Sequence, residues 1–175
     1  MHKNFNNIGK ICYGRGSFAQ LGDIIAPVRS RNNGGFIFLI DDYFEQSHIS
    51  DHLPLLSHDS LYFIDCSDEE PKTSQIDALR DEILAAKGLP SGVVGIGGGS
   101  ILDIAKALAL MLTNEGSSVQ YQGLNLIKKQ GIYHLGIPTI SGTGAECSMT
   151  AVLTGPEKKL GLKCEWTVFD QVILD

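Results

Sequence analysis

The sequence has few basic residues, and their scarcity excludes one class of partner. The 14 lysines and arginines are outnumbered by 20 aspartates and glutamates, which gives a formal net charge of -6 at pH 7. Nucleic-acid binding relies on basic side chains gathered on one face, whereas the basic residues here cluster only as the pairs Lys128-Lys129 and Lys158-Lys159. We therefore expect no nucleic-acid partner.

The sequence also lacks an apolar run long enough to cross a membrane, and it lacks a secretion signal at its start. Its longest apolar stretch, Ile101–Leu112, is interrupted by Asp103 and Lys106, and a spanning helix needs about 20 apolar residues. The opening MHKNFNNIGK contains no apolar segment of the kind that a signal peptide requires. We expect a cytoplasmic protein without a membrane partner.

Cysteine is scarce and is not arranged in CxxC pairs. The four cysteines are widely spaced: Cys12, Cys66, Cys147 and Cys164. An even number permits a disulfide framework, but such frameworks are typical of small secreted domains with little core. Because 43% of this chain is hydrophobic, it can bury a sizeable core, and we expect free thiols.

Short apolar runs alternate with segments of helical spacing along the chain. The runs typical of buried strands are Ile8–Tyr13, Phe36–Ile40, Leu61–Ile64, Val93–Ile96, Leu135–Ile137 and Val168–Asp175. Apolar residues recur at helical spacing in Gln75–Ala86 and Ser100–Thr113. This alternation predicts an α/β fold, a Rossmann-like doubly wound and mostly parallel sheet. We expect residues 1–175 to form one dinucleotide-binding domain.

A β-hairpin is predicted near the end of the chain. Thr150–Leu153 and Leu160–Glu165 are strand-like and flank a turn that contains Gly155-Pro156. We expect this hairpin to be attached to the parallel sheet.

One strand runs directly into glycines in the stretch VVGIGGGSILDIAKALALML. The turn consists of Gly97, Gly98, Gly99 and Ser100. Glycines at a strand-to-helix turn leave backbone N–H groups uncovered beside the positive end of the helix, where a pyrophosphate can bind. The alternative is structural: Ser100 as N-cap and Asp103 three residues on fit a capping box, and the glycines then serve the turn alone.

A second strand-to-loop junction, PTISGTGAE, offers hydroxyl groups to the same ligand. These groups belong to Thr139, Ser141 and Thr143. Thr143 and Glu146 fit a second capping box, which predicts a helix after this loop. The carboxyl ends of parallel strands lie at one edge of a sheet, so we expect both glycine loops there.

Asp41, at the end of the run FIFLID, is a candidate for binding an adenosine ribose. An acidic residue at this place accepts hydrogen bonds from the ribose hydroxyls and repels a 2′-phosphate, which favours NAD over NADP. Asp42 could take this role instead, and either residue could simply form a turn.

These stretches together resemble the iron-containing (group III) alcohol dehydrogenases. GGGSILDIAK and PTISGTGAE are similar to the two signature loops of that family, and KICYGRGSFAQLGDI is similar to its first strand and helix. PTISGTGAE departs from the commoner PTTAGTGSE at Ile140, Ser141 and Ala145. The resemblance covers essentially the whole chain and implies the dehydroquinate-synthase-like amino-terminal domain.

The resemblance also implies a role for individual residues. It places Gly97, Gly98, Gly99 and Ser100 on the cofactor pyrophosphate, Asp41 on the adenosine ribose, and Thr139, Ser141 and Thr143 between adenine and nicotinamide. Asp103 and Lys106 would support the nicotinamide side of the cleft, and Lys159 would approach the nicotinamide ribose. The alternative for Asp103 and Lys106 is an ion pair on the helix surface.

Other stretches resemble one branch of the family. SDEEPKTSQIDAL, MLTNEGSSVQYQGLNLIKK and KLGLKCEWTVFDQVILD are similar to enzymes that oxidise the 8-hydroxyl of 3-deoxy-D-manno-octulosonate. The resemblance implies a sugar-acid substrate, and a pyridoxal-phosphate aminotransferase that acts next in making the 8-amino sugar of lipopolysaccharide. Either NAD or oxygen could be the final acceptor.

The metal site of the family is not expected in this chain. The resemblance implies ligands, an aspartate and three histidines, in a carboxyl-terminal helical domain that would begin after Asp175. His48 and His52, with His58 beyond, have a spacing that could bind zinc, but they fall near the adenosine end, and His134 is expected in a loop. We expect Fe(2+) or Zn(2+) only in a full-length enzyme, and no turnover by this chain.

Two further expectations concern assembly and function class. A sheet that lacks its covering domain exposes apolar surface, so we expect a homodimer or a poorly soluble chain. A non-catalytic nucleotide-binding domain, or a remnant of an enzyme, is the alternative function. No Walker A motif and no glycine-flanked hydrolase serine are found.

Overall fold

A computed structural model describes residues 7–32, 34–67 and 70–175. Its centre is a six-stranded sheet of order β1-β9-β6-β4-β2-β3, in which every pairing is parallel. The strands are β1 (Lys10–Tyr13), β2 (Phe36–Asp41), β3 (Ser60–Ile64), β4 (Gly92–Gly97), β6 (Tyr133–Pro138) and β9 (Gln171–Leu174). The predicted α/β fold with a mostly parallel sheet is confirmed.

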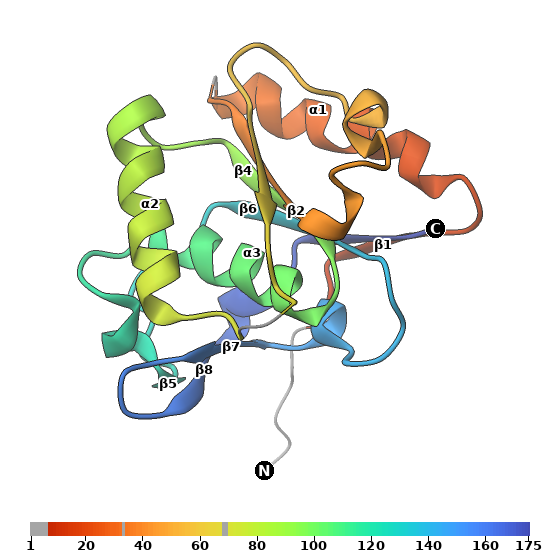
Figure 1. Cartoon of the computed structure of the whole chain (residues 1–175). Coiled ribbons are helices and arrows are strands. Elements are labelled where there is room, and N and C mark those ends of the chain that lie inside the picture. Colours follow the sequence, from red (N-terminus) through yellow and green to blue (C-terminus); the bar gives the residue numbers. More distant parts are fainter. Residues whose placement is uncertain (1–6, 33, 68–69) are drawn as a thin grey trace.

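Helices cover both faces of this sheet (Figure 1). Helix α1 (Leu21–Asn32) lies on one face, and α2 (Thr73–Lys87) and α3 (Gly99–Met111) lie on the other. The alternation of β2 explains the two layers: Phe36, Phe38 and Ile40 pack with α1, whereas Ile37 and Leu39 pack with α2 and α3.

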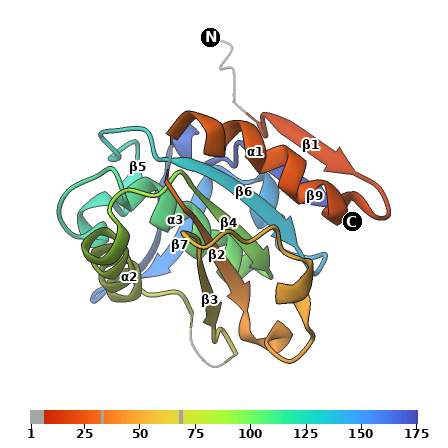
Figure 2. The same ribbon diagram turned by 90° about the horizontal axis from the view of Figure 1, so that it is seen from above.

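The predicted hairpin exists but does not join the main sheet. β7 (Thr150–Thr154) and β8 (Lys159–Lys163) pair antiparallel and form a separate three-stranded sheet with β5 (Gly123–Leu124). The expectation that the hairpin attaches to the parallel sheet is therefore wrong. Ala151, Leu153 and Leu162 of the small sheet pack into the core around α3, so α3 lies between two sheets (Figures 1 and 2).

This position explains the composition of α3, which is apolar on every side. A helix that is hydrophobic all round is one that is buried all round, and ten residues of α3, from Ile101 to Met111, are buried. The glycine turn is thus joined to a helix that is packed on both sides.

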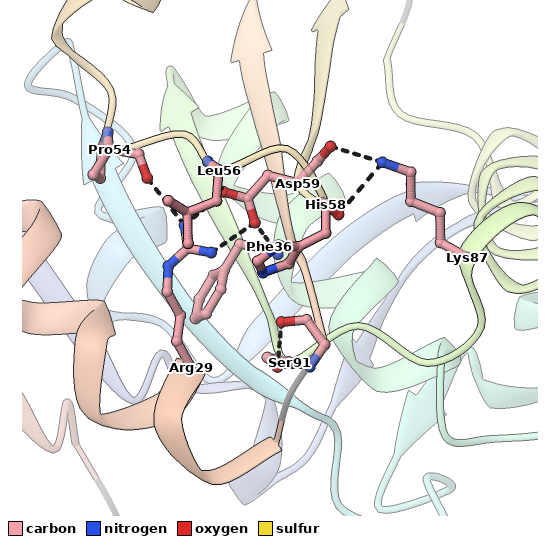
Figure 3. A network of polar contacts seen from close by, with 9 residues as sticks. Arg29, Phe36, Pro54, Leu56, His58, Asp59, Lys87 and Ser91 are labelled. Atoms are coloured by element: carbon pink, nitrogen blue, oxygen red, sulfur yellow. Dashed lines mark hydrogen bonds and ion pairs between the residues drawn. The ribbon is translucent and has the colours of Figure 1, made fainter.

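An ion pair fixes the opposite, amino-terminal edge of the sheet. Both guanidinium NH groups of Arg29 on α1 donate to the carboxylate of Asp59, at 2.7 and 2.6 Å (Figure 3). The same carboxylate accepts the backbone N–H groups of Phe36 and Leu56. Burial alone would raise the pKa of Asp59, but these hydrogen bonds outweigh it and hold the pKa below the usual 3.8. The network ties α1, β2 and the loop before β3 together.

The structure also shows the state of the cysteines and the place of His134. All four cysteines are free, as predicted, and no helix in the described residues is long and apolar enough to cross a membrane. His134 was expected in a loop, which is wrong: it lies within β6, is buried, and its ring packs 5.2 Å from the ring of Phe169.

Candidate functional site

The glycine turn joins β4 to α3 at the carboxyl edge of the large sheet. The helix begins at Gly99 with Gly98 as its N-cap, and no side chain caps it. The capping box expected for Ser100 and Asp103 is therefore wrong. The first N–H groups of α3 are left for another acceptor, as at helix ends that bind anions.

The three glycines are there for different reasons. A Cβ on Gly97 would lie 2.7 Å from Cγ1 of Ile101, and one on Gly99 would lie 2.7 Å from Oγ1 of Thr143, so packing within the protein excludes both. A Cβ on Gly98 would meet only Cγ2 of Ile140, at an ordinary 3.6 Å. Among these three glycines, only Gly98 could carry a side chain without a clash within the protein.

The second loop meets the first, as predicted. The backbone N–H of Thr139 donates to the carbonyl of Gly97 at 3.1 Å, and Thr143 lies against Gly99. The helix expected after Thr143 is absent from this part of the described chain: a short 3-10 turn, Ala145–Cys147, stands in its place, and Oγ1 of Thr143 accepts the N–H of Ala145. Thr139 and Ser141 are exposed on this loop.

Asp41 ends β2, the strand beside β4, and so lies next to the glycine turn. Its Cβ is 3.1 Å from the Cβ position of Gly97, and its carboxylate accepts the N–H of Tyr43 at 3.2 Å. Burial raises the pKa of the Cys66 thiol to about 11, and the negative charges of nearby carboxylates add to this effect. The Asp41 carboxylate contributes most among them. The thiol nearby therefore stays protonated at neutral pH.

A cavity of about 430 Å³ opens beside the start of α3. Its walls come from α3, from the second loop, from the small sheet and from the segment before α2. The lining residues are Glu70, Pro71, Gly99, Ser100, Asp103, Thr143, Ala145, Ser148, Thr150, Val152 and Lys159. The ammonium of Lys159 is paired with the carboxylate of Glu70, which also accepts the hydroxyl of Thr154 at 3.1 Å. The sequence reasoning missed Glu70 and Ser148, which no local pattern distinguishes.

Asp103 and Lys106 do form an ion pair, with 2.9 Å between Oδ1 and Nζ, but not on the helix surface. The Lys106 side chain is 0% exposed and lies behind the cavity wall, and the other carboxylate oxygen of Asp103 accepts the N–H of Val152. Burial lowers the pKa of the Lys106 ammonium, and the charge of Asp103 counteracts this. The surface alternative for this pair is wrong.

The comparison with known protein families agrees with this geometry. The profile described as "Iron-containing alcohol dehydrogenase" matches residues 9–175. The chain belongs to this family. Among the relatives in sequence, sulfoacetaldehyde reductase of Bilophila wadsworthia is 39% identical over 109 residues, which are 61% of this chain and 27% of that protein. Long-chain-alcohol dehydrogenase 1 of Geobacillus thermodenitrificans is 36% identical over 86 residues, 47% of this chain and 22% of that protein.

Solved structures share the fold of this chain. Sulfoacetaldehyde reductase from Bifidobacterium kashiwanohense, in complex with NAD+, superposes with a TM-score of 0.80 at 22% identity, over 100% of this chain and 46% of that one. A 1,3-propanediol oxidoreductase gives a TM-score of 0.83 at 19% identity, with the same coverage. The chain thus spans less than half the length of these relatives.

The metal of the iron-containing alcohol dehydrogenases does not fit the residues present. Within residues 7–32, 34–67 and 70–175, no three His, Cys, Asp or Glu side chains are grouped so that they could hold a metal ion. His48 and Asp51 form a pair 3.5 Å apart, but their side chains are 84% and 67% exposed.

Proposed function

We propose that this chain is the NAD-binding part of an oxidoreductase that interconverts an alcohol and a carbonyl compound. When bound, NAD supplies the acceptor of the hydride. The single observation that carries the proposal is Gly98: a side chain is missing where the fold has room for one, at the start of a helix that no side chain caps. The family membership supports the same reaction class.

Different residues would bind different parts of the dinucleotide. Backbone N–H groups of Gly98, Gly99 and Ser100 would hold the pyrophosphate, because a helix amino terminus attracts negative charge. Asp41, one strand away, would accept the adenosine ribose hydroxyls and repel a 2′-phosphate. The nicotinamide half would enter the cavity beside α3, whose rim carries the ammonium of Lys159.

The second loop would close the site from the other side. Thr139, Ser141 and Thr143 carry hydroxyl groups on the segment that crosses the glycine turn, where they would bind the stretch between adenine and nicotinamide. Asp103 would act through the N–H of Val152, which it holds at 3.0 Å.

We also propose, as a finer assignment, a hydroxyl-rich sugar acid of the 3-deoxy-octulosonate kind as the substrate. Its support is the likeness of the stretches quoted above. The relative from Bilophila is named a sulfoacetaldehyde reductase, which makes a sulfonated aldehyde the competing substrate. Saturation-transfer NMR of the chain with bound NAD, offered octulosonate or sulfoacetaldehyde, compares the two, and signal from sulfoacetaldehyde alone would contradict the sugar acid.

Calorimetric titration tests the cofactor proposal directly. NAD and NADH should bind to the chain with a single site, and NADP should bind at least about tenfold more weakly, because one charged hydrogen bond is worth about 1.5–3 kcal/mol. Absence of heat with every dinucleotide would overturn the proposal.

A further inference from the structure

His134 carries a buried nitrogen atom without a partner. Its side chain is 4% exposed near the start of β6, and its Nε2 has no hydrogen-bond partner among the described residues. Buried polar atoms are almost always paired, so an exception of this kind needs an explanation. It lies at the amino-terminal edge of the large sheet, at the opposite end of β6 from the second loop.

The other nitrogen of the His134 ring determines what Nε2 can do. Nδ1 lies 3.2 Å from the carbonyl oxygen of Ile132 and 3.2 Å from Oδ2 of Asp170. Both neighbours are acceptors, so we assign the proton to Nδ1, which leaves a lone pair on Nε2. The N–H of His134 donates to Oδ2 of Asp170 at 2.9 Å, and the N–H of Asp170 donates to the carbonyl of His134 at 3.0 Å. The two residues are thus fixed to each other, and Nε2 is an acceptor that lacks a donor.

A cavity of about 230 Å³ has His134 in its wall. Two carboxylate-bearing residues, Glu165 and Asp170, and two aromatic residues, Trp166 and Phe169, line it as well. None of the described residues that line it is a lysine or an arginine. Carboxylates attract a cation, aromatic rings bind one over their faces, and the lone pair of Nε2 accepts a hydrogen bond. The wall therefore favours a ligand that is both positively charged and a hydrogen-bond donor.

The size of this cavity and the side chains around it narrow the ligand class further. Pockets for drug-sized ligands have volumes of about 300–1,000 Å³, so this one suits a molecule of only a few non-hydrogen atoms. A metal ion does not fit, because the described part of the chain has no group of three His, Cys, Asp or Glu side chains that could hold one. A quaternary ammonium has no N–H to donate to Nε2. A small primary ammonium meets all of these conditions.

We propose that the cavity beside His134 binds a small primary amine in its ammonium form. One N–H of the ammonium donates to Nε2 of His134, and the carboxylates of Glu165 and Asp170 balance its charge. The site is separate from the glycine turn, because the two lie at opposite ends of the strands and the two cavities share no lining residue among those described. The inference therefore goes beyond the proposed function and does not depend on NAD binding.

NMR titration of the ¹⁵N-labelled chain with ethylammonium chloride tests this site. The Nε2 resonance of His134 and the backbone amides of Gly131 and Asp170 should shift saturably, with a Kd in about the millimolar range, which is the ceiling for so small a ligand. Acetate, an anion of similar size, should cause no saturable shift. Nα-acetyl-lysine amide should bind more weakly than ethylammonium. If it binds more tightly, the occupant is a lysine side chain of another protein, and the proposal of a free amine is overturned.

Two variants, each checked by thermal unfolding, show whether the named groups hold the probe. His134→Phe keeps a ring against Phe169 and removes the acceptor, so ethylammonium should bind at least about tenfold more weakly, the loss of a charged hydrogen bond. His52→Phe, the same substitution at an exposed position outside the cavity, is the matched control and should bind the probe as the wild type does.

Glu165→Gln keeps the test decisive if His134→Phe does not fold. It removes one charge at an exposed position and should weaken ethylammonium at least about threefold. No saturable shift of the wild type with ethylammonium, an equal response to acetate, or an unchanged affinity in the folded variants would overturn the proposal.

Discussion

Substituting Gly98 by valine distinguishes a glycine kept for a ligand from one kept for the turn. The backbone at Gly98 has φ -74° and ψ -173°, a region open to every residue. Its added Cβ would make only an ordinary contact, 3.6 Å from Ile140. The free energy of unfolding should therefore change by no more than about 0.5 kcal/mol, as for most surface substitutions.

Binding should respond quite differently. The valine methyl groups would occupy the space that the pyrophosphate needs to reach the N–H groups at the start of α3, and several charge-assisted hydrogen bonds would be lost. At about 1.5–3 kcal/mol each, the loss of two is at least about a hundredfold in affinity. Calorimetric titration with NADH, on protein shown to be folded by thermal unfolding, measures it.

Gly97→Ala is the informative comparison, because that glycine is required by packing. Its Cβ would lie 2.7 and 2.8 Å from Cγ1 and Cβ of Ile101, and overpacking of this kind costs about 1–3 kcal/mol of stability. A folded Gly98→Val protein with wild-type affinity for NADH would refute the reasoning, because the glycines would then serve the turn alone.

Three further outcomes are expected. Asp41→Asn, which keeps an oxygen for the N–H of Tyr43, should reduce the preference for NAD over NADP to near unity, a change of about tenfold or more; an unchanged ratio in parallel titrations would place the ribose elsewhere. Arg29→Met should destabilise the fold by about 3 kcal/mol in urea unfolding, because it strands the Asp59 carboxylate. The pKa of Asp59 is lowered on folding, so its contribution to the free energy of unfolding is present above the unfolded pKa and is lost as the pH falls through the folded pKa, below about 4. The difference in stability between wild type and Arg29→Met should therefore shrink below this pH. A stability difference that stays constant down to pH 2 would contradict this. After incubation with iron or zinc and desalting, elemental analysis should find no stoichiometric metal on the chain, and assays with alcohols should find no NAD reduction; one metal ion retained per chain would show a ligand set that the described residues do not form.

The strands and both glycine loops could be predicted from the sequence because their signals are local. Each apolar run is bounded by polar residues or glycine, and a parallel sheet places the ends of β4 and β6 at one edge whatever the details of packing. The topology thus places the two loops that follow β4 and β6 beside each other. The antiparallel pairing of β7 with β8 was likewise visible in the turn between them.

The remaining features depend on contacts between distant segments. Nothing near the hairpin in sequence indicates that it pairs with the two residues of β5 and leaves the main sheet. An Asp and a Lys three residues apart on a helix predict an ion pair on the helix surface. The prediction fails here because the small sheet covers the side of α3 that the large sheet leaves open, so α3 is buried on all sides. The capping box expected at Ser100 does not form, because the N-cap of α3 is Gly98, two residues before Ser100. Glu70 reaches the cavity through its contacts with Thr154 and Lys159.

Hydrogen–deuterium exchange of the chain with and without saturating NADH tests whether the glycine turn and the second loop bind the dinucleotide, because it reports on the backbone N–H groups themselves. Bound NADH should slow exchange in residues 97–102 and 139–145 and around Asp41, with no change at the amino-terminal edge of the sheet near Arg29 and Asp59. Unchanged exchange in the glycine turn, or protection confined to another surface, would contradict it.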